Sequence, residues 1–443
     1  MKFYYILFAM LLGASPLFAQ HMQHDTTHNM PMGMNMEDMQ SGHKPMQMHS
    51  MFSRDLPMNR DGSGTSWVPD ETPIYAYMFH GKKWMTMVHG SVFLRYNNQD
   101  VFNKGSRGGR NFDAPNWFMV MTQRDVGKNG LFTISGMFSL DPLTVGNAGY
   151  PLLYQTGESY QGNKLVDKQH PHDLFAAISL NYTQRIAKNT DVNLSVGYPG
   201  EPSMGPPVFM HRLSAMNNPN APLSHHYQDA THITFGVVTT GFRYKNVKME
   251  GSIYTGREPD EHRYGFDKIR MDSYAVRLSY NPSRQWALQV SNGWLHDPEG
   301  SNHHGSISRT TASAIHTKML NDDSHISTTL VYGQNHQTDG GKTQPSVLLE
   351  SNLQWHKTAF YTRYEFVQKD ADEMALDVLF PTNPNFNINA LTVGVNRILA
   401  TAKQTNLSAG VQATFNASPK TLQGIYGNTP VGFQVYLRVN PTF

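Results

Sequence analysis

The sequence predicts an all-β fold: a transmembrane, antiparallel up-and-down β-barrel of about sixteen strands, within a range of fourteen to eighteen. Three observations lead to this prediction: strict period-two alternation at the carboxyl terminus, its recurrence along the chain, and the lengths of the connections. Beyond the amino-terminal leader, the chain has no apolar run long enough for a membrane-spanning helix, so such spans are excluded.

The clearest alternation lies at the carboxyl terminus. The odd positions from Val431 to Phe443 carry hydrophobic side chains, whereas the even positions from Gly432 to Thr442 are glycine or carry a polar group. Successive side chains of a strand point to opposite faces, so one face of this segment is apolar and the other is polar. A segment of this length can cross a bilayer as a tilted strand.

The same pattern recurs upstream, for example from Leu174 to Tyr182 and from Leu407 to Phe415. Any single run could be an edge strand of a soluble protein, whereas repetition along the whole chain favours one large sheet. The alternation predicts strands at 84–96, 116–124, 129–140, 173–186, 190–198, 231–244, 246–256, 272–281, 285–295, 308–319, 324–334, 346–356, 358–368, 387–399, 404–416 and 431–443.

The connections between these segments alternate between short and long. Short ones include Ala187 to Asn189 and Ala400 to Lys403, and the long ones include 141–172, 199–230 and 369–386. A barrel with short periplasmic turns and long outer loops has this arrangement, and its closure also removes exposed strand edges. A large soluble β protein is the alternative, although a sandwich has no reason to segregate its long loops.

Four regions are expected to follow one another along the chain. Residues 1–19 fit a secretory signal peptide, and residues 20–51 form a Met/His-rich segment expected to be disordered and to bind metal. Residues 52–83 are a tether or a partial plug, and residues 84–443 form the barrel. The expected location is the bacterial outer membrane, and an even number of strands places both termini in the periplasm.

Two further predictions concern the side chains, one at the strand ends and one on the lumen face. Aromatic residues at strand ends fit interfacial girdles, namely Trp117, Tyr280, Trp286, Trp294, Tyr332 and Trp355. Charged residues with lumen parity are expected to form a solvated ladder, namely Lys248, Glu250, Arg277, Arg363 and Glu365.

The Met/His-rich segment is the strongest chemical signal in the sequence. Thioether sulfur is a soft ligand that suits Cu(I), and imidazole also accepts Cu(II), so this mixture favours copper, with Cu(I) preferred and silver as a second ion. Pro31, Gly33 and Asn35 separate the methionines, so these build no apolar core face. The nine methionines and five histidines are His21, Met22, His24, His28, Met30, Met32, Met34, Met36, Met39, His43, Met46, Met48, His49 and Met51.

Further candidate metal ligands lie in the predicted outer loops and beside them. An H-x-H pair in an extended segment can place both imidazoles on one side, and a neighbouring carboxylate can ligate the metal or orient a ring. Such histidines are also frequent as plain hydrogen-bond partners. The candidates are His170, His172, Asp173, Met204, Met210, His225, His226 and His232, the last with lumen parity in the predicted strand 231–244.

Composition excludes several classes of partner and chemistry. The formal net charge of +2 argues against a nucleic-acid surface, and the absence of cysteine excludes disulfides and thiolate metal sites. The expected partners are outer-membrane lipid and lipopolysaccharide, whose phosphates the basic loop from Gly105 to Arg110 could touch.

The Met/His-rich run from His21 to Met51, followed by alternating strands that end at Phe443, resembles the copper resistance protein B group of outer-membrane proteins. The resemblance implies copper tolerance through periplasmic sequestration or passage across the outer membrane, with periplasmic copper proteins as partners. The terminal aromatic is similar to the end of other bacterial outer-membrane barrels, which the barrel assembly machinery recognises.

Two other functions are left open by the sequence. One is a general or substrate-specific diffusion porin, in which the Met/His-rich lead is incidental. The other is an outer-membrane hydrolase that uses a histidine at the barrel rim. No Ser/His/Asp spacing identifies a nucleophile with its base, so we expect a protein without enzymatic activity.

Overall fold

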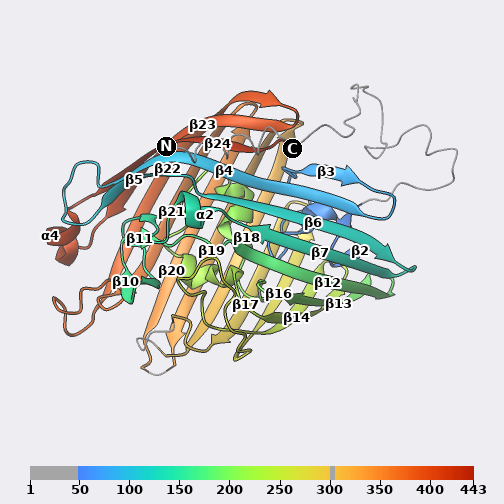
Figure 1. The fold of residues 1–443 in the computed structure, drawn as a ribbon, viewed down its shortest axis with the longest axis horizontal. Helices are drawn as coiled ribbons and strands as arrows, with labels where there is room; N and C mark the ends of the chain where they lie inside the picture. Colours follow the sequence, from blue (N-terminus) through green and yellow to red (C-terminus); the bar gives the residue numbers. More distant parts are fainter. Residues whose placement is uncertain (1–47, 300–304, 339) are drawn as a thin grey trace. The chain divides into compact units, whose positions relative to one another are not determined.

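Sixteen long antiparallel strands close into one barrel, which confirms the predicted fold class (Figure 1). The computed structural model describes residues 48–299, 305–338 and 340–443. The strands are β4 (Met85–Gln99), β6 (Asn116–Val126), β7 (Gly130–Phe138), β12 (Phe175–Ala187), β13 (Thr190–Gly197), β14 (Val237–Tyr244), β15 (Val247–Tyr254), β16 (Ser273–Ser283), β17 (Trp286–Leu295), β18 (Ile307–Asn321), β19 (Ser324–Gln337), β20 (Thr343–Trp355), β21 (Thr358–Asp370), β22 (Asn385–Ala402), β23 (Thr405–Ala417) and β24 (Val431–Pro441).

The last strand closes the barrel against the first. β24 pairs with β4 in a register that runs from Phe433 opposite Asn98 to Val439 opposite Val92. Two short strands widen the sheet beside β4: β3 (Tyr77–His80) pairs with its beginning, and β5 (Gly109–Asp113) pairs with its end. Closure leaves no exposed edge along the long strands.

Tight turns join the strands in pairs at one end of the barrel. Asn189, Lys245, His356 and Lys403 have positive φ in such turns, as the primed two-residue hairpins require. The long connections leave the opposite end and carry α2 (Asp141–Thr144), β8 (Tyr150–Pro151), β9 (Glu158–Tyr160), β10 (Asn163–Leu165), β11 (Lys168–Gln169), η5 (Lys420–Leu422) and α4 (Gln423–Tyr426). In Figure 1, β10, β11 and α4 lie at the end opposite to β3.

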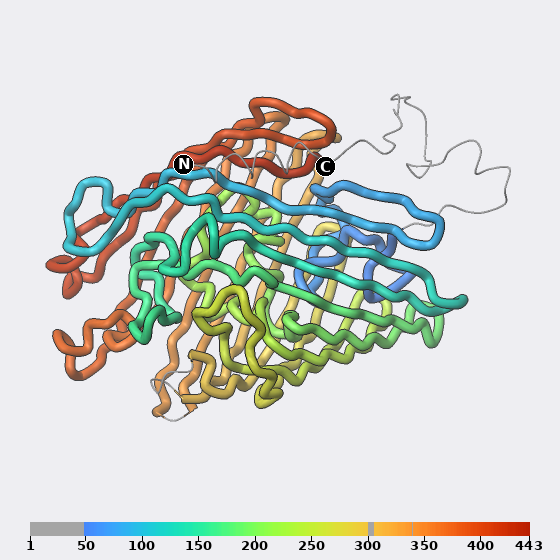
Figure 2. Tube along the Cα trace, in the orientation of Figure 1, coloured from blue at the N-terminus to red at the C-terminus, as the bar shows by residue number. Residues whose placement is uncertain are grey.

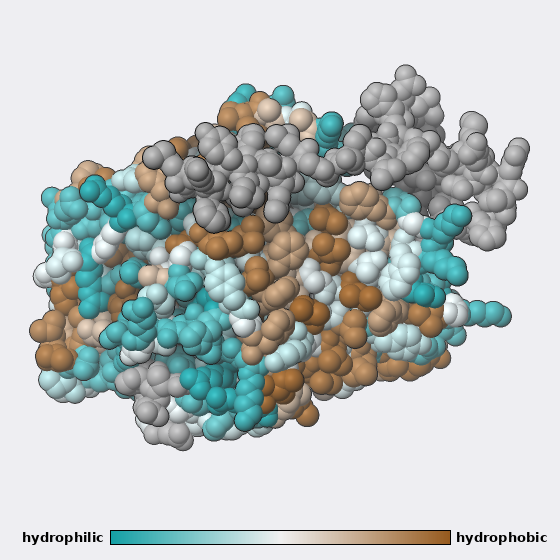
Figure 3. Space-filling model, viewed as in Figure 1, coloured by the Kyte–Doolittle hydropathy of each residue, from teal (hydrophilic) through white to brown (hydrophobic). Residues whose placement is uncertain are grey.

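The strands alternate between an apolar outer face and a polar inner face. On β21, Phe360 and Tyr364 are exposed, whereas Arg363 is buried inside the barrel. Figure 3 shows brown, hydrophobic side chains gathered over the strands, with teal side chains toward the ends. A closed barrel with an apolar exterior satisfies every backbone group of its wall within a bilayer, and this is the architecture of a transmembrane β-barrel. No helix in the described ranges is long and apolar enough to cross a membrane.

An amino-terminal segment, residues 48–76, lies inside the barrel. It contains β1 (His49–Ser50), β2 (Ser53–Pro57) and η1 (Met58–Arg60), and its blue trace passes behind the nearer strands in Figure 2. Its contacts reach the inner wall: Arg277 on β16 donates to the Thr65 hydroxyl at 2.7 Å, and Asn281 donates to the Val68 carbonyl at 2.9 Å.

The connection between β13 and β14 folds inward and spans the barrel interior. It contains η2 (Phe209–His211), η3 (Leu213–Ala215), α3 (His225–Gln228) and η4 (Ala230–His232). Its side chains and backbone reach β15, β20 and β24: Ser203 contacts Ser252 at 2.8 Å, Asn217 donates to Asn352 at 2.9 Å, and Arg438 donates to Asn217 at 2.8 Å. We call residues 199–236 the inward loop.

Three details of the predicted fold are wrong. His232 lies in η4 of the inward loop, because β14 begins only at Val237. Trp117 faces the interior, where its ring lies 4.7 Å from that of His211, and so belongs to no lipid-facing girdle. The lumen charges are not solvated: Lys248, Glu250 and Arg277 are buried beneath residues 48–76 and the inward loop, where they form ion pairs.

Candidate metal centre

Five histidines from two outer connections meet inside the barrel. His170 and His172 lie between β11 and β12, while the inward loop supplies His225 and His226 on α3 and His232 on η4. The rings of His225 and His232 have centroids 5.2 Å apart, and those of His172 and His232 are 5.5 Å apart. We call these five residues the histidine cluster.

The remaining ring contacts make the cluster continuous. The His225 and His226 rings lie 5.3 Å apart, and His170 lies 5.8 Å from His226 and 6.4 Å from His225. His225 therefore occupies the middle of the group. Two imidazoles that share one tetrahedral ion through their nitrogens have ring centres about 5 Å apart, given metal–nitrogen bonds of about 2.0–2.1 Å. The shortest separations in the cluster match this value.

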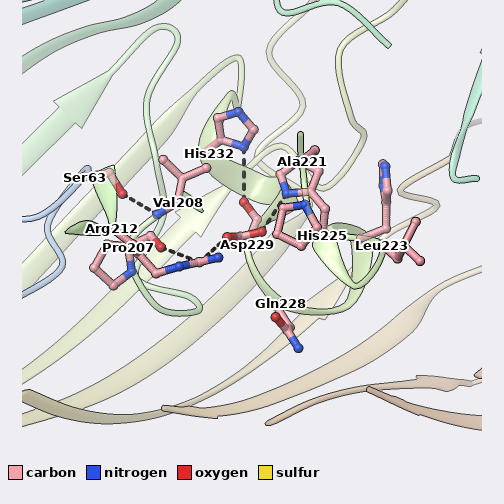
Figure 4. Close-up of polar contacts among 12 residues, drawn as sticks. Ser63, Pro207, Val208, Arg212, Ala221, Leu223, His225, Gln228, Asp229 and His232 are labelled. Carbon is pink, nitrogen blue, oxygen red and sulfur yellow. Dashed lines mark hydrogen bonds and ion pairs between the residues drawn. The ribbon is translucent and has the colours of Figure 1, made fainter. Parts of the chain in front are cut away.

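The inward loop is folded so that one residue, Asp229, holds two of the rings, one through its carboxylate and one through its backbone carbonyl. Nδ1 of His225 donates to Oδ1 of Asp229 at 2.6 Å, one turn further along α3, and Nδ1 of His232 donates to the Asp229 backbone carbonyl at 3.1 Å (Figure 4). Arg212 donates to Oδ2 of Asp229 at 2.6 Å and to Glu350 of β20 at 2.7 Å. The barrel wall thus fixes both rings through a chain of buried polar contacts.

Two other carboxylates hold two more rings. Nδ1 of His172 donates to Asp141 at the start of α2 at 2.7 Å, and Nδ1 of His226 lies 3.3 Å from Oε1 of Glu258. A carboxylate that accepts from one ring nitrogen fixes the tautomer and directs the other nitrogen outward as a lone-pair donor. This arrangement on three separate rings suits imidazoles that bind a metal through Nε2.

The free nitrogens of the cluster are not all equivalent. Nε2 of His226 and Nε2 of His232 are buried and have no hydrogen-bond partner. His170 differs, because its Nδ1 lies 3.1 Å from the Pro171 carbonyl and its Nε2 lies 3.1 Å from Glu158. A buried ring nitrogen without a partner costs free energy, which a bound cation would recover. His170 is the least available ligand of the five.

Burial lowers the pKa of His170, His225 and His232, whereas at His226 the neighbouring Glu258 outweighs burial and the pKa rises. Burial, followed by the neighbouring His225 and His172, lowers the pKa of His232 well below its usual value, and burial also lowers the pKa of His225. Burial raises the pKa of Asp229, but Arg212 and His225 outweigh it, so the net shift is downward and the carboxylate stays ionised. Neutral imidazole beside an ionised carboxylate is the protonation state that binds metal.

The structure does not place all predicted loop ligands in the cluster. Asp173 lies 3.6 Å from Arg263, and burial raises its pKa to about 7. Asp141, and not Asp173, is the carboxylate that contacts His172. Met204 packs against Tyr254 with the sulfur 3.8 Å from the hydroxyl oxygen, in a separate hydrophobic cluster. Met210 lines a different cavity, which also contains His211.

Most of the predicted Met/His-rich segment lies outside the described residues, from His21 to Met46. Its last residues are folded: His49 pairs in β1 and exchanges hydrogen bonds through its backbone with Gln123 of β6, while Met51 is buried and Met48 packs beside it. The structure therefore assigns Met48, His49 and Met51 to the barrel interior.

Sequence reasoning missed the carboxylates that hold the cluster. Asp141, Asp229 and Glu258 come from three different connections and share no spacing with the histidines, apart from the i, i+4 pair of His225 and Asp229. That pair is the one signal the sequence contains. Within the described ranges, no three His, Asp or Glu side chains are gathered in metal-ligating geometry.

Comparison with known proteins gives similarity of overall shape and little similarity of sequence. The chain is similar to Salmonella typhi OmpF in its complex with daunomycin, with 7% identity over 82% of this chain and 100% of that chain and a TM-score of 0.48. It is also similar to the anion-selective porin from Comamonas acidovorans, with 12% identity over 81% and 100% and a TM-score of 0.44. No protein-family model matches the sequence, and the comparison with curated proteins finds no match.

Proposed function

We propose that this protein is an outer-membrane barrel that binds transition-metal ions inside its lumen, copper above all, and passes them across the membrane. The observation that carries the proposal is the histidine cluster, in which His172, His225 and His226 each have a carboxylate on Nδ1. Among divalent first-row ions, nitrogen ligands bind Cu(II) most tightly. The proposal assigns the barrel no catalytic step.

We propose an orientation in which both the amino-terminal and the carboxyl-terminal end of the barrel wall lie on the periplasmic side. Phe443 lies 4.9 Å from Tyr75, which precedes the barrel wall, and 5.6 Å from His325 beside a tight turn, measured between ring centroids. Tight turns face the periplasm in outer-membrane barrels. In this orientation the Met/His-rich lead would exchange copper or silver with periplasmic copper proteins, and the long loops would face lipopolysaccharide.

The test compares Cu(II) binding by the full chain with binding by His225→Gln/His232→Gln. We expect the double variant to lose one Cu(II) per molecule and the corresponding nitrogen hyperfine signal in electron paramagnetic resonance. His336→Gln is the matched control, because His336 lies on β19, where its Nδ1 is 2.9 Å from the Thr343 hydroxyl and outside the histidine cluster. Unchanged Cu(II) stoichiometry and spectrum in the double variant would overturn the proposal.

A diffusion channel is the second candidate, and the strand number favours it, because porins with a water-filled lumen have sixteen to eighteen strands. In this chain, residues 48–76 and the inward loop fill much of that lumen. Conductance in planar bilayers separates the two functions: steady conductance of a wide pore supports the porin, and its absence in a protein that binds Cu(II) supports selective metal passage.

A further inference from the structure

A second group of methionine and histidine side chains lies inside the barrel, separate from the histidine cluster and its carboxylates. It surrounds a cavity of about 130 Å³. The sulfur and imidazole side chains that line this cavity are Met58, Met87, Met119, Met121, Met210, Met216, His89 and His211. We call this cavity the methionine pocket.

The barrel wall supplies half of these ligands through strand register. Met87 on β4 lies directly opposite Met121 on β6, and His89 lies opposite Met119. All four point into the interior, and Met119 is 6% and Met121 2% exposed. Directly opposed residues on one face of an antiparallel pair have Cβ atoms within about 5.5 Å. The register therefore concentrates three thioethers and an imidazole on one patch of wall.

The two interior segments supply the rest. Met58 comes from η1, and Met210, His211 and Met216 come from the inward loop. Three stretches of chain that are distant in sequence thus converge on the same cavity. Methionine is also a common filler of irregular hydrophobic cores, so the methionines alone do not identify a ligand site.

The two histidines supply the independent observation. The rings of His89 and His211 lie 5.5 Å apart, and the Trp117 ring contacts both, at 5.2 and 4.7 Å. Nε2 of each histidine is buried and has no hydrogen-bond partner. Two unpartnered imidazole nitrogens on a thioether-lined cavity are costly for a site built only for hydrophobic packing. A soft cation would satisfy both.

The charged residues that line the pocket, Asp61, Arg212 and Arg438, are already hydrogen-bonded to other groups. Asp61 accepts from the Ser50 hydroxyl at 2.6 Å and from the Met51 amide at 2.8 Å, and Arg438 donates to Ser91 at 2.9 Å. The ligands that remain are uncharged. Burial of a monovalent ion among neutral ligands costs less than burial of a divalent ion, because desolvation rises with charge.

We propose that the methionine pocket is a binding site for one soft monovalent ion, Cu(I) or Ag(I), held by thioethers of the wall and the inward loop together with His89 or His211. This site goes beyond the proposed function, since it is separate from the histidine cluster and differs in ligand chemistry. A smaller cavity of about 40 Å³, lined by both His211 and His232, lies between the two groups. Toward the tight turns, a cavity of about 260 Å³ shares Tyr75 and Met216 with the pocket.

Trp117 provides a local probe of the site in the full-length protein. Ag(I) titration should change the tryptophan fluorescence of the native chain, and the change should disappear in Trp117→Phe. Met119→Leu/Met121→Leu keeps side-chain volume but removes both sulfurs, and we expect it to weaken the Trp117-reported Ag(I) affinity at least tenfold. Met374→Leu is the control, because Met374 is fully buried in another cluster.

The test separates this site from the histidine cluster. His225→Gln/His232→Gln should keep the Trp117 response to Ag(I) even if it loses Cu(II). If the double methionine variant fails to fold, as judged by heat-modifiable migration, Met210→Leu gives the same readout from the inward loop with an expected loss of several-fold. Absence of a Trp117-dependent response, or an unchanged Ag(I) affinity in the folded methionine variants, would overturn the proposal.

Discussion

Arg212 holds Asp229 in place inside the barrel: Nη1 of Arg212 lies 2.6 Å from Oδ2 of Asp229, while Oδ1 accepts from His225 at 2.6 Å. Glu350 on β20 anchors Arg212 from the other side at 2.7 Å. The orientation of a candidate metal ligand on the inward loop therefore depends on a residue of the barrel wall.

Asp229→Asn should lower Cu(II) affinity by about ten- to a hundredfold, as expected when an outer carboxylate is removed from a metal-binding histidine. The amide has one acceptor oxygen and no negative charge, so it cannot accept from both His225 and Arg212. Isothermal titration calorimetry measures the effect. Asp323→Asn is the control, because Asp323 forms the same kind of contact with His356, 2.7 Å long, on an exposed turn. Equal affinity in the two variants would contradict the role of Asp229.

Glu350→Gln should release the inward loop from the wall. Glu350 accepts from Arg212 and, at 3.0 Å, from Arg363, so its loss removes the carboxylate partner of Arg363 and leaves Arg212 with Asp229 alone. Removal of one partner of a buried ion pair costs about 3–5 kcal/mol. We expect faster proteolysis within residues 199–236. We also expect the folded band to convert to the unfolded band at a lower temperature in the heat-modifiable migration assay. Asp377→Asn, at an exposed position, should leave both unchanged.

A disulfide should lock the inward loop to the wall. The Ser203 and Ser252 hydroxyl oxygens lie 2.8 Å apart, so Ser203→Cys/Ser252→Cys brings two thiols within bonding reach. The chain has no other cysteine, which makes the product unambiguous. Oxidation should give a shift in unfolded migration that reducing agent reverses, and each single variant should show none. Failure of the pair to oxidise in folded protein would mean that the loop does not rest against β15.

Deletion of residues 49–76 should open the lumen. These residues contact the inner wall through Thr65 and Val68, and their removal vacates the space that they occupy. Planar bilayers should show a higher single-channel conductance than the intact chain, whereas deletion of the exposed pair Val378–Leu379 should not raise it. The same conductance in the shortened and intact chains would show that residues 49–76 do not obstruct the channel.

The orientation predicts which positions are accessible on intact cells. Val378, 84% exposed in a long connection, should be labelled by an impermeant thiol reagent after substitution to cysteine. A cysteine at Asn189, in a tight turn, should be protected until the outer membrane is permeabilised. The reverse pattern would invert the proposed orientation.

The sequence by itself determined the barrel. Period-two alternation is a local property of each strand, and the apolar face must meet lipid, so the wall could be predicted from Val431 to Phe443 and from its upstream repeats. The tight turns followed from the same pattern, and Asn189 and Lys245 occupy them with positive φ. The sequence also contained the candidate histidines of the cluster, as isolated loop residues.

Only the tertiary structure decided what fills the barrel. A long outer connection can extend into solvent or fold inward, and this depends on contacts such as Asn217 with Arg438, whose residues are far apart in sequence. In the same way, the fold brings Asp141 to His172 and Glu258 to His226. Loops have no periodicity from which such long-range contacts can be inferred. Closure of the barrel supplies the surface on which they form.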